Sequence, residues 1–559
     1  MLLRAEDHGK SVALPPADGG APRGGEAMTA YIIGLDFGTE SARGVLIDAA
    51  TGAAIASHVH PYRHGVMTTA LPSGRKLPRD WALQAAPDYA EAAEVVLTAL
   101  GKGREIRSIG LDFTASTPLP CLADGTPLSV LYPDEPHAYA KLWKHHAAIA
   151  WADRITAAKP DFLRHYSNRT SSEWVLAKAG QIADEAPEIW RRAERFIEGG
   201  DWMVWQLTGI EARSKCQAGY KVHYQEPQGY PTGVVPGLTE KLSPPLSIGR
   251  PAGSLTDAWR QKTGIEGPAV VAVAVIDAHA VMPAVAATQP GVIVGALGTS
   301  ACYMLLDRSC KDIPGIEGAV LDGAISGLWC YESGQAAFGD VLAWFIRNFP
   351  RGADEAASFA AYNEAAAQLP KDDMRPIAID WWNGCRVPLG DSALSGLMVG
   401  MTLRHTAVDL YHSLMEALCF GARRIVDTFT DGGAAVERVI LTSGIAERNA
   451  LLMQMMADVL GRDIEVPAIA NATATGAAIH GAVAAGLVAD YDAGAALFGA
   501  KSAKHYHPDG AAVPIYEKRY RHYLALCRDS RIIDVLHDLA HPMATDPAGN
   551  NQVAHRVRA

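Results

Sequence analysis

The sequence predicts a two-lobed α/β protein with mixed sheets. The chain has 559 residues, and a single hydrophobic core stops growing at about 250–300 residues, so two large lobes are expected. A strand–turn–strand pattern with a Gly-Thr turn occurs twice, roughly half the chain apart, as two related lobes would require. Short apolar strands and helical patterns follow each copy, an alternation that is typical of α/β proteins.

The first hairpin is predicted at residues 31–48, YIIGLDFGTESARGVLID. An apolar strand carries Asp36 near its end, the chain turns at Gly38 and Thr39, and a second apolar strand follows. An acid inside such a turn is an unusual local choice. It becomes intelligible if phosphates and a metal ion have to bind there, since carboxylates are preferred ligands of Mg²⁺. The alternative is an aspartate that only caps the turn.

The second copy is VIVGALGTSACYMLLD at residues 292–307, with its turn at Gly298, Thr299 and Ser300. Backbone N–H groups of a Gly-rich turn can point together at an anion without obstruction from side chains. One such turn alone is most often an ordinary hairpin. The pair, each between buried strands, predicts two phosphate-binding turns.

Other elements complete the α/β pattern. We expect a strand at 106–113 that enters the polar loop 114–118, and an amphipathic helix within 402–430. A strand at 436–441 leads into Ser443-Gly444, a turn where a purine or ribose could approach the backbone, although an ordinary strand–helix loop would look the same. Further helices are expected from 449 and 472.

The most apolar window, 267–287, predicts a buried strand that leads into a helix. Asp277, His279 and Pro283 lie in its middle, which makes a membrane span costly. Asp277 follows a fully apolar run and is the best candidate for acid–base chemistry. Its alternative is a helix cap, and His279 could be an ordinary packed histidine. As a metal pair, Asp277 and His279 lack an evident third ligand.

Composition restricts the partners and the compartment. Apolar residues make up 49%, charged residues 20%, and the net charge of −11 is dispersed. No basic block appears, so nucleic acid and anionic membranes are poor partners. The eight cysteines include no CxxC pair, which argues for reduced cytoplasmic thiols. Residues 1–28 lack the apolar core of a signal peptide and are expected to be a disordered extension; 531–559 are expected to be a C-terminal tail.

Several segments resemble one protein family. Together with the two turns, they are similar to the FGGY carbohydrate kinases of the actin/hexokinase/Hsp70 superfamily, and within that family to the L-ribulokinases of bacterial arabinose catabolism. The likeness runs from about residue 31 to about residue 525. The segments are DFTASTPLP (112–120), LWKHHA (142–147), SSEWVLAK (171–178), QAGYK (217–221), ESGQAAFGD (332–340) and DWWNGCR (380–386).

The resemblance implies a fold and an activity. The fold would be the two-lobed actin-like (ribonuclease H-like) sugar kinase fold with an interlobe cleft, its sugar-binding lobe at 29–288 and its nucleotide-binding lobe at 289–530. The activity would be ATP-dependent phosphorylation of L-ribulose to L-ribulose 5-phosphate, with ATP and Mg²⁺ as cofactors. A homodimer is the family's expectation. The alternatives are a related kinase for another pentulose or pentitol (D-ribulose, L-xylulose, ribitol) and a nucleotide-binding regulator without sugar chemistry.

The resemblance also implies roles for single residues. Asp277 corresponds to the family's general base and Asp36 to its metal-associated aspartate. Taken alone, Lys221 reads as a surface lysine and Glu332 as a helix N-terminal glutamate. The ketopentose contacts correspond to Ala115, Lys221 and Glu332, and the nucleotide contacts to Gly38, Thr39, Gly298, Thr299, Ser300, Ser443 and Gly444.

Two positions depart from the family pattern. Ser443 occupies a position where glycine is usual, so the adenosine pocket is expected to differ in shape. His145 stands where ribulokinases have an acid, which bears on the choice of sugar rather than on the kinase class.

Overall fold

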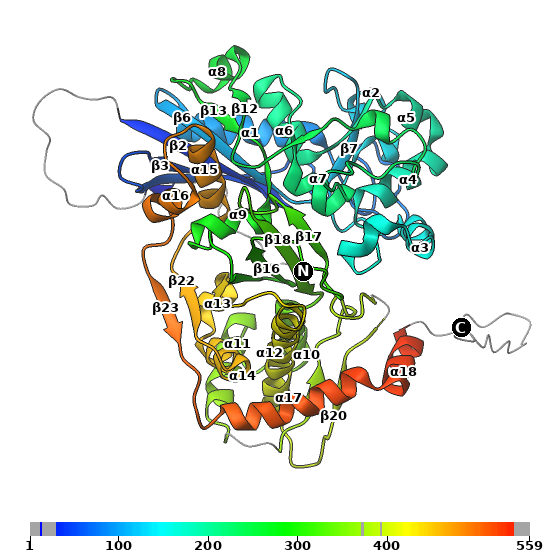
Figure 1. Cartoon of the computed structure of the whole chain (residues 1–559), viewed down its shortest axis with the longest axis vertical. Helices are drawn as coiled ribbons and strands as arrows, with labels where there is room; N and C mark the ends of the chain where they lie inside the picture. The colour runs from blue at the N-terminus through cyan, green and yellow to red at the C-terminus, as the bar shows by residue number, and fades with distance from the viewer. Residues whose placement is uncertain (1–11, 14–28, 371–373, 392–393, 541–559) are drawn as a thin grey trace, which may run out of the picture.

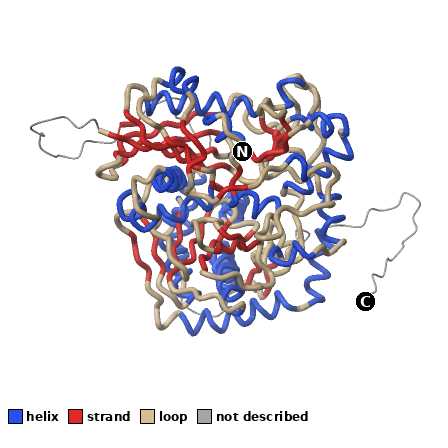
Figure 2. Tube along the Cα trace, turned by 45° about the horizontal axis from the view of Figure 1, so that its top comes forward, coloured by secondary structure: helices blue, strands red, loops and turns tan. Residues whose placement is uncertain are grey.

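The computed structural model describes residues 12–13, 29–370, 374–391 and 394–540. Two large sheets lie one above the other, with helices around them (Figures 1 and 2). The predicted strands and hairpins form, and both hairpins occupy the middle of their sheets.

The first sheet has the order β1-β4-β3-β2-β6-β13-β12, and β14 pairs with β6. Strands β2, β6, β13 and β14 run parallel, whereas β3, β4 and β12 pair antiparallel to their neighbours. Parallel strands end at the same edge of a sheet, so this edge collects the residues that follow them. The bounds are β1 Val12–Ala13, β2 Ala30–Phe37, β3 Ser41–Asp48, β4 Ala54–Pro61, β6 Glu105–Phe113, β12 Pro251–Ser254, β13 Val270–Ala272 and β14 Val275–Ile276.

The second sheet repeats this design, with the order β17-β18-β16-β15-β21-β22-β23. Strands β15, β21 and β22 are parallel, and the other pairs are antiparallel. The equivalent sheets explain the sequence repeat. The bounds are β15 Val292–Leu297, β16 Ala301–Asp307, β17 Gly318–Leu321, β18 Trp329–Gln335, β21 Arg438–Thr442, β22 Ile464–Pro467 and β23 Ala503–Tyr506.

Helices α9 (Asp277–Ala284) and α15 (Ala472–Ala484) connect the two sheets. Although α15 follows β22 of the second sheet, it packs against β2 and β6 of the first (Figure 1). The contact is between backbones: a Cβ added at Gly34 would lie 1.7 Å from the Ala474 carbonyl oxygen. Gly476, on α15 itself, makes an equally close approach to Ala280 of α9.

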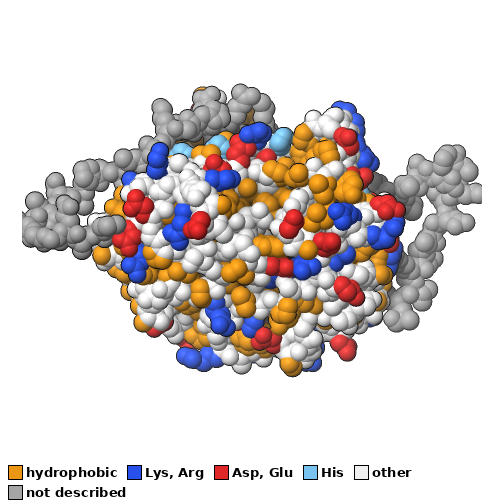
Figure 3. Space-filling view, turned by 90° about the horizontal axis from the view of Figure 1, so that it is seen from above, with side chains coloured by type: hydrophobic (Ala, Val, Ile, Leu, Met, Phe, Trp, Pro, Cys, Tyr) orange, Lys and Arg blue, Asp and Glu red, His pale blue; other side chains and the backbone are white. Residues whose placement is uncertain are grey.

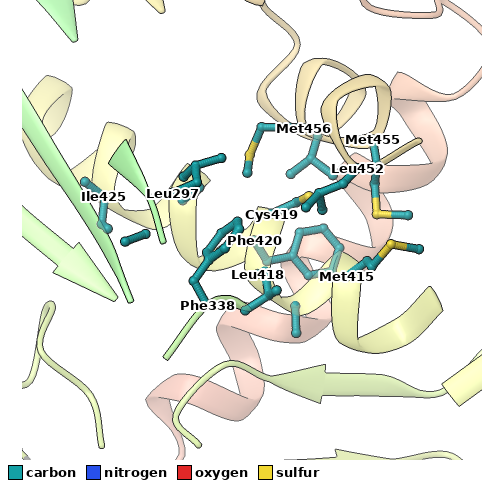
Figure 4. Packing of buried hydrophobic residues seen from close by; sticks show 14 of the residues in the cluster. Leu297, Phe338, Met415, Leu418, Cys419, Phe420, Ile425, Leu452, Met455 and Met456 are labelled. Carbon is teal, nitrogen blue, oxygen red and sulfur yellow. The ribbon is translucent and has the colours of Figure 1, made fainter. Parts of the chain in front are cut away.

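The core of the second lobe surrounds α12 (Ala407–Asp431), which begins five residues after the start of its predicted range. Figure 4 shows Leu297 and Phe338 beside the apolar side chains of α12 and of α14 (Ala450–Leu460). Leu297 precedes Gly298, and Phe338 precedes α10 (Gly339–Asn348). The core therefore packs directly against the residues that flank the second Gly-Thr turn.

The remaining expectations concern the ends and the surface. Helix α18 occupies Ser530–Ala540, so the segment predicted as a tail begins with a helix, and its other residues lie outside the described part. Of the predicted extension, only β1 is described. All eight cysteines are free, as predicted. No helix in the described ranges is long and apolar enough to cross a membrane. Acidic and basic side chains alternate over the face in Figure 3.

We expect Gly34→Ala to lower the free energy of unfolding by about 3 kcal/mol or more, because the new methyl group meets backbone atoms that cannot move aside. Gly510→Ala is the control, since a Cβ there meets nothing within 4 Å. Urea unfolding of both variants measures the difference. Equal stability of the two would contradict the backbone contact.

Candidate active site

Three carboxylates meet at the edge where the parallel strands of the first sheet end. Asp36 of β2 lies in register with Asp112 of β6, and Asp112 lies in register with Val275 of β14. Asp277 follows β14 directly and is the first residue of α9. Its carboxylate accepts a hydrogen bond from the Ala278 amide at 2.7 Å.

Burial dominates the electrostatics of these acids. It raises the pKa of Asp277 to about 7, and the charge of Asp36 adds to the shift. Burial also raises the pKa of Asp112 well above its usual value, with further contributions from Asp36 and Asp277. A carboxyl group with a pKa near neutrality is suited to accept a proton, which agrees with the role predicted for Asp277.

In each Gly-Thr turn, the glycine amide donates to a carbonyl within the turn, three residues ahead in the first turn and two residues ahead in the second. The Gly38 amide donates to the Ser41 carbonyl at 3.0 Å, and the Gly298 amide donates to the Ser300 carbonyl at 2.8 Å. These glycine amides therefore close the turns. Within the described residues, the Thr39 and Thr299 amides donate no hydrogen bond, so they are the donors available to an anion.

Distant segments hold the first turn in place. The indole of Trp143 donates to the Thr39 hydroxyl at 3.2 Å, and the Gln84 amide donates to the Thr39 carbonyl at 2.7 Å. The Thr473 hydroxyl, at the start of α15, donates to the Asp36 carboxylate at 2.8 Å. The same helix that joins the two sheets therefore orients Asp36.

The second turn lies beside the predicted adenosine loop. Strand β21 pairs with β15 up to Ala296 and Thr442, so Ser443 and Gly298 follow neighbouring strand ends. Gly444 begins the short helix α13 (Gly444–Arg448), and the Ser443 hydroxyl caps it by accepting hydrogen bonds from two amides. Ser443 has φ 145° and ψ 174°, a conformation that is essentially restricted to glycine.

Lys221 and Glu332 meet across the two lobes. Lys221 is on α7 (Lys215–Val222), Glu332 is on β18, and their charged atoms are 3.7 Å apart. Burial opposes both charges, but the neighbouring opposite charges, led by the partner in each case, together outweigh it: the pKa of Lys221 is raised and that of Glu332 is lowered. Both groups are therefore ionised. Because Glu332 lies within β18, it is a strand residue and not the first residue of a helix.

His279 lies on the other side of Glu332. Its Nε2 is 3.4 Å from a Glu332 oxygen, and its ring packs on Tyr220. Burial lowers the pKa of His279 to about 4, so the ring is neutral near pH 7. His279 is therefore a buried, neutral histidine that packs beside the glutamate predicted to bind sugar.

A buried lysine shapes the loop around Ala115. Ala115 packs against the cluster that contains Ile276 and Tyr220. The next residue, Ser116, has φ 57°. Its carbonyl accepts a hydrogen bond from Lys178, which also donates to the carbonyls of Lys141 and Leu142. One ammonium group thus connects two loops beside the site.

His145 has a structural environment. It is fully buried, and its ring bonds to Gln181 at 2.9 Å and packs edge-on against Trp81. Burial lowers its pKa well below the usual value. His145 is therefore a neutral packing residue, and this argues against a role for it in the choice of sugar.

The acidic edge fits a divalent cation. Both oxygens of Asp112 are buried without a hydrogen-bond partner in the described ranges, beside Asp36. Those ranges contain no group of three or more His, Cys, Asp or Glu side chains able to hold a metal. Mg²⁺ needs no such group, because it keeps several waters and binds one or two carboxylates together with substrate phosphates.

The sequence analysis did not identify Asp112, although a signal was present. GLDF occurs at 34–37 and again at 110–113, and these copies lie side by side on β2 and β6. Thr473, Trp143 and Lys178 carried no local signal, because their roles depend on contacts between distant segments.

Comparisons with known proteins give the family. A model of the FGGY family of carbohydrate kinases, C-terminal domain, matches residues 293–485. The chain is 41% identical over 531 residues to a ribulokinase of Halalkalibacterium halodurans, covering 89% of this chain and 94% of the relative. It is 40% identical over 526 residues to a ribulokinase of Mycolicibacterium smegmatis, covering 89% and 93%. The chain belongs to the FGGY family of carbohydrate kinases.

The solved structures agree with the fold of this carbohydrate kinase. The crystal structure of xylulose kinase from Rhodospirillum rubrum superposes with a TM-score of 0.77 at 22% identity, over 91% of this chain and 100% of that one. The predicted two-lobed kinase fold and the predicted enzyme class are confirmed.

The protein with Ser443 and the protein with glycine at position 443 should differ in stability. We expect Ser443→Gly to raise the free energy of unfolding by about 1 kcal/mol, because the relieved strain of about 1–3 kcal/mol exceeds the lost cap. Ser443→Ala keeps the strain and loses the cap, so it should cost about 1 kcal/mol. Denaturant unfolding measures both, and effects of the same sign would contradict the strain.

The raised pKa of Asp277 makes its charge destabilising. Its carboxyl group titrates near pH 7 in the folded state and near 3.8 otherwise, so the penalty is absent below the lower value and complete above the higher one. We expect the stability gain of Asp277→Asn to grow by about 2 kcal/mol from about pH 5.5 to about pH 8.5. Chemical unfolding at both pH values measures it, with Asp257→Asn, whose side chain is 97% exposed, as the control. A gain that did not change with pH would contradict the burial.

Proposed function

We propose that the protein transfers the γ-phosphoryl group of ATP to the O5 hydroxyl of L-ribulose, as a cytoplasmic step of pentose (arabinose) catabolism. The observation that carries this proposal is the Lys221–Glu332 pair beside Asp277, in a chain 41% identical to a ribulokinase. The free cysteines fit the reducing cytoplasm. A sugar-binding lobe at 29–288 and a nucleotide-binding lobe at 289–530 belong to the proposal, as does a homodimer.

Lys221 and Glu332 are suited to an uncharged polyol. The ammonium group donates hydrogen bonds, the carboxylate accepts them, and hydrogen bonds to charged groups are the strong ones. Ala115 lies on the loop that Lys178 fixes, so its backbone would contact the sugar from a rigid position. These contacts would hold the O5 hydroxyl near Asp277.

Asp277 would accept the proton of that hydroxyl. Because an alcohol is a far weaker acid than a carboxylic acid, the proton leaves late, and Asp277 mainly aligns the nucleophile until then. Phosphoryl transfer depends on positioning and charge stabilisation more than on covalent chemistry. Closure of the lobes over the sugar would exclude water, which could otherwise take the phosphoryl group.

The two Gly-Thr turns would hold the phosphates of ATP. The Thr39 and Thr299 amides would donate to them, with Ser300 beside the second turn and Ser443-Gly444 near the adenosine. Asp36, with Asp112 next to it, would hold Mg²⁺, which neutralises phosphate charge when it is bound.

The test is ADP release with purified protein, ATP and Mg²⁺ across L-ribulose, D-ribulose, L-xylulose, D-xylulose, ribitol and glycerol. We expect turnover to be fastest with L-ribulose and to fall about 10²–10⁴-fold in Asp277→Asn, the range that a general base supplies. Asp257→Asn is the matched control and should leave turnover unchanged, because that carboxylate is exposed on the surface.

Each outcome separates the parts of the proposal. Turnover with another sugar alone would keep the mechanism and change the substrate. Full activity of Asp277→Asn would show that Asp277 is not the general base. A folded protein that binds ATP but shows no sugar-dependent turnover would overturn the proposed activity.

A further inference from the structure

Arg386 is a positively charged residue to which the proposed mechanism assigns no role. It lies in the loop after β19 (Ile377–Ile379), and its Nε is 3.7 Å from a carboxylate oxygen of Glu317. The side chains of Arg386 and Glu317 are 30% and 23% exposed. This is an ion pair and not a hydrogen bond, and the guanidinium donates no hydrogen bond to any residue in the described ranges. A guanidinium offers five donors in a fixed fork, so most of this group's capacity remains available to a ligand.

The pair lies on the same sheet face as Glu332. A Cβ built on Gly334 would be 3.0 Å from a Glu317 oxygen and 3.5 Å from a terminal nitrogen of Arg386. Gly334 and Glu332 are two residues apart on β18, and residues i and i+2 of a strand face the same way. The missing side chain at position 334 thus leaves room for this pair beside Glu332.

Glu332 links Asp277 with the Arg386–Glu317 pair electrostatically. After burial, the charges that act on the pKa of Asp277 are those of Asp36, Lys221 and Glu332. The pKa of Arg386 is raised first by Glu317, then by Glu173, Cys302 and Glu332. Glu332 is common to both sets. Glu317 directly precedes β17, the edge strand of this sheet, and its amide donates to the Glu332 carbonyl at 2.8 Å. The Arg386–Glu317 pair therefore lies between Glu332 and the edge of the sheet.

We propose that Arg386, positioned by Glu317, binds the end of the sugar remote from the hydroxyl that Asp277 activates; this inference rests on the proposed function. A ketose carries a carbonyl oxygen and a hydroxymethyl group at that end. The carbonyl oxygen only accepts hydrogen bonds, which the guanidinium can supply, and the hydroxyl can donate to Glu317. This contact would make the enzyme selective for the ketose end of its substrate.

The test compares Arg386→Met, Arg386→Lys and Glu317→Ala with the unaltered protein. We expect Arg386→Met to lower kcat/KM for L-ribulose at least about tenfold, since a hydrogen bond from a charged group is lost. The loss should come through KM for the sugar, while KM for ATP and sugar-independent ATP hydrolysis stay unchanged. Arg386→Lys should recover part of the loss, and Glu317→Ala should raise KM for the sugar without lowering kcat.

Arg438→Met is the matched control. It breaks a different Arg–carboxylate pair, with Glu465 at 2.8 Å on β21 and β22, and should leave KM for the sugar unchanged. Sugar-induced increases in Tm, recorded for the whole sugar panel, give a binding readout that does not need turnover. They also show that Arg386→Met is folded.

Three results would overturn the proposal. The first is an unchanged sugar KM and an unchanged Tm increase in Arg386→Met. The second is an equal loss in KM for ATP or in ATP hydrolysis, which would place Arg386 with the phosphates. The third is the absence of any sugar-induced Tm increase in the unaltered protein. Failure of turnover alone, with sugar binding retained and weakened in Arg386→Met, would overturn the proposed function and keep this site.

Discussion

The active site depends on one close contact between backbones. Gly34 and Gly110 lie in register on β2 and β6, and α15 packs onto both at a distance that no side chain permits. On its other side α15 meets α9, whose first residue is Asp277. Since α15 also brings Thr473 to Asp36, this contact fixes the position of two carboxylates of the candidate site, Asp36 and Asp277, relative to the second sheet. A small loss of fit there would separate the groups that have to react together.

Several residues of the candidate site have an environment or a backbone conformation that is unfavourable for their residue type. Carboxyl groups are buried close to one another, and Ser443 has a glycine conformation. Such features reduce stability and persist only where the surrounding structure determines them. The apolar cluster around α12 supplies that surrounding structure for the second turn and for the helix that follows Ser443. Stability and the proposed activity therefore oppose each other at Asp277, because the charge that the proposed base needs also destabilises the fold.

Local pattern was enough to predict the hairpins, the strand that leads to Asp277 and the α/β class, because each depends on residues that are close in sequence. That Lys221 and Glu332 belong to one site came only from the family resemblance, since 111 residues separate them, and their ion pair came only from the structure. Neither hydropathy nor spacing indicates that Lys178 donates to three carbonyls or that Glu317 holds Arg386. Even at the Gly-Thr turns, the pattern located the loops but not their free donors, because the glycine amides close the turn.

The distribution of charge along the site matches the two halves of the reaction. At the Asp36 end several carboxyl groups lie close together, and Asp112 has no hydrogen-bond partner within the described residues, an arrangement that suits a metal ion and the phosphates it accompanies. From Lys221 onward, each carboxylate faces a cation, as Glu332 faces Lys221 and Glu317 faces Arg386. A paired region has little net field and many hydrogen-bonding groups, so it favours a neutral polyol over an anion. This difference in charge agrees with the proposed placement of the nucleotide phosphates at the Asp36 end and of the sugar at the Lys221 end.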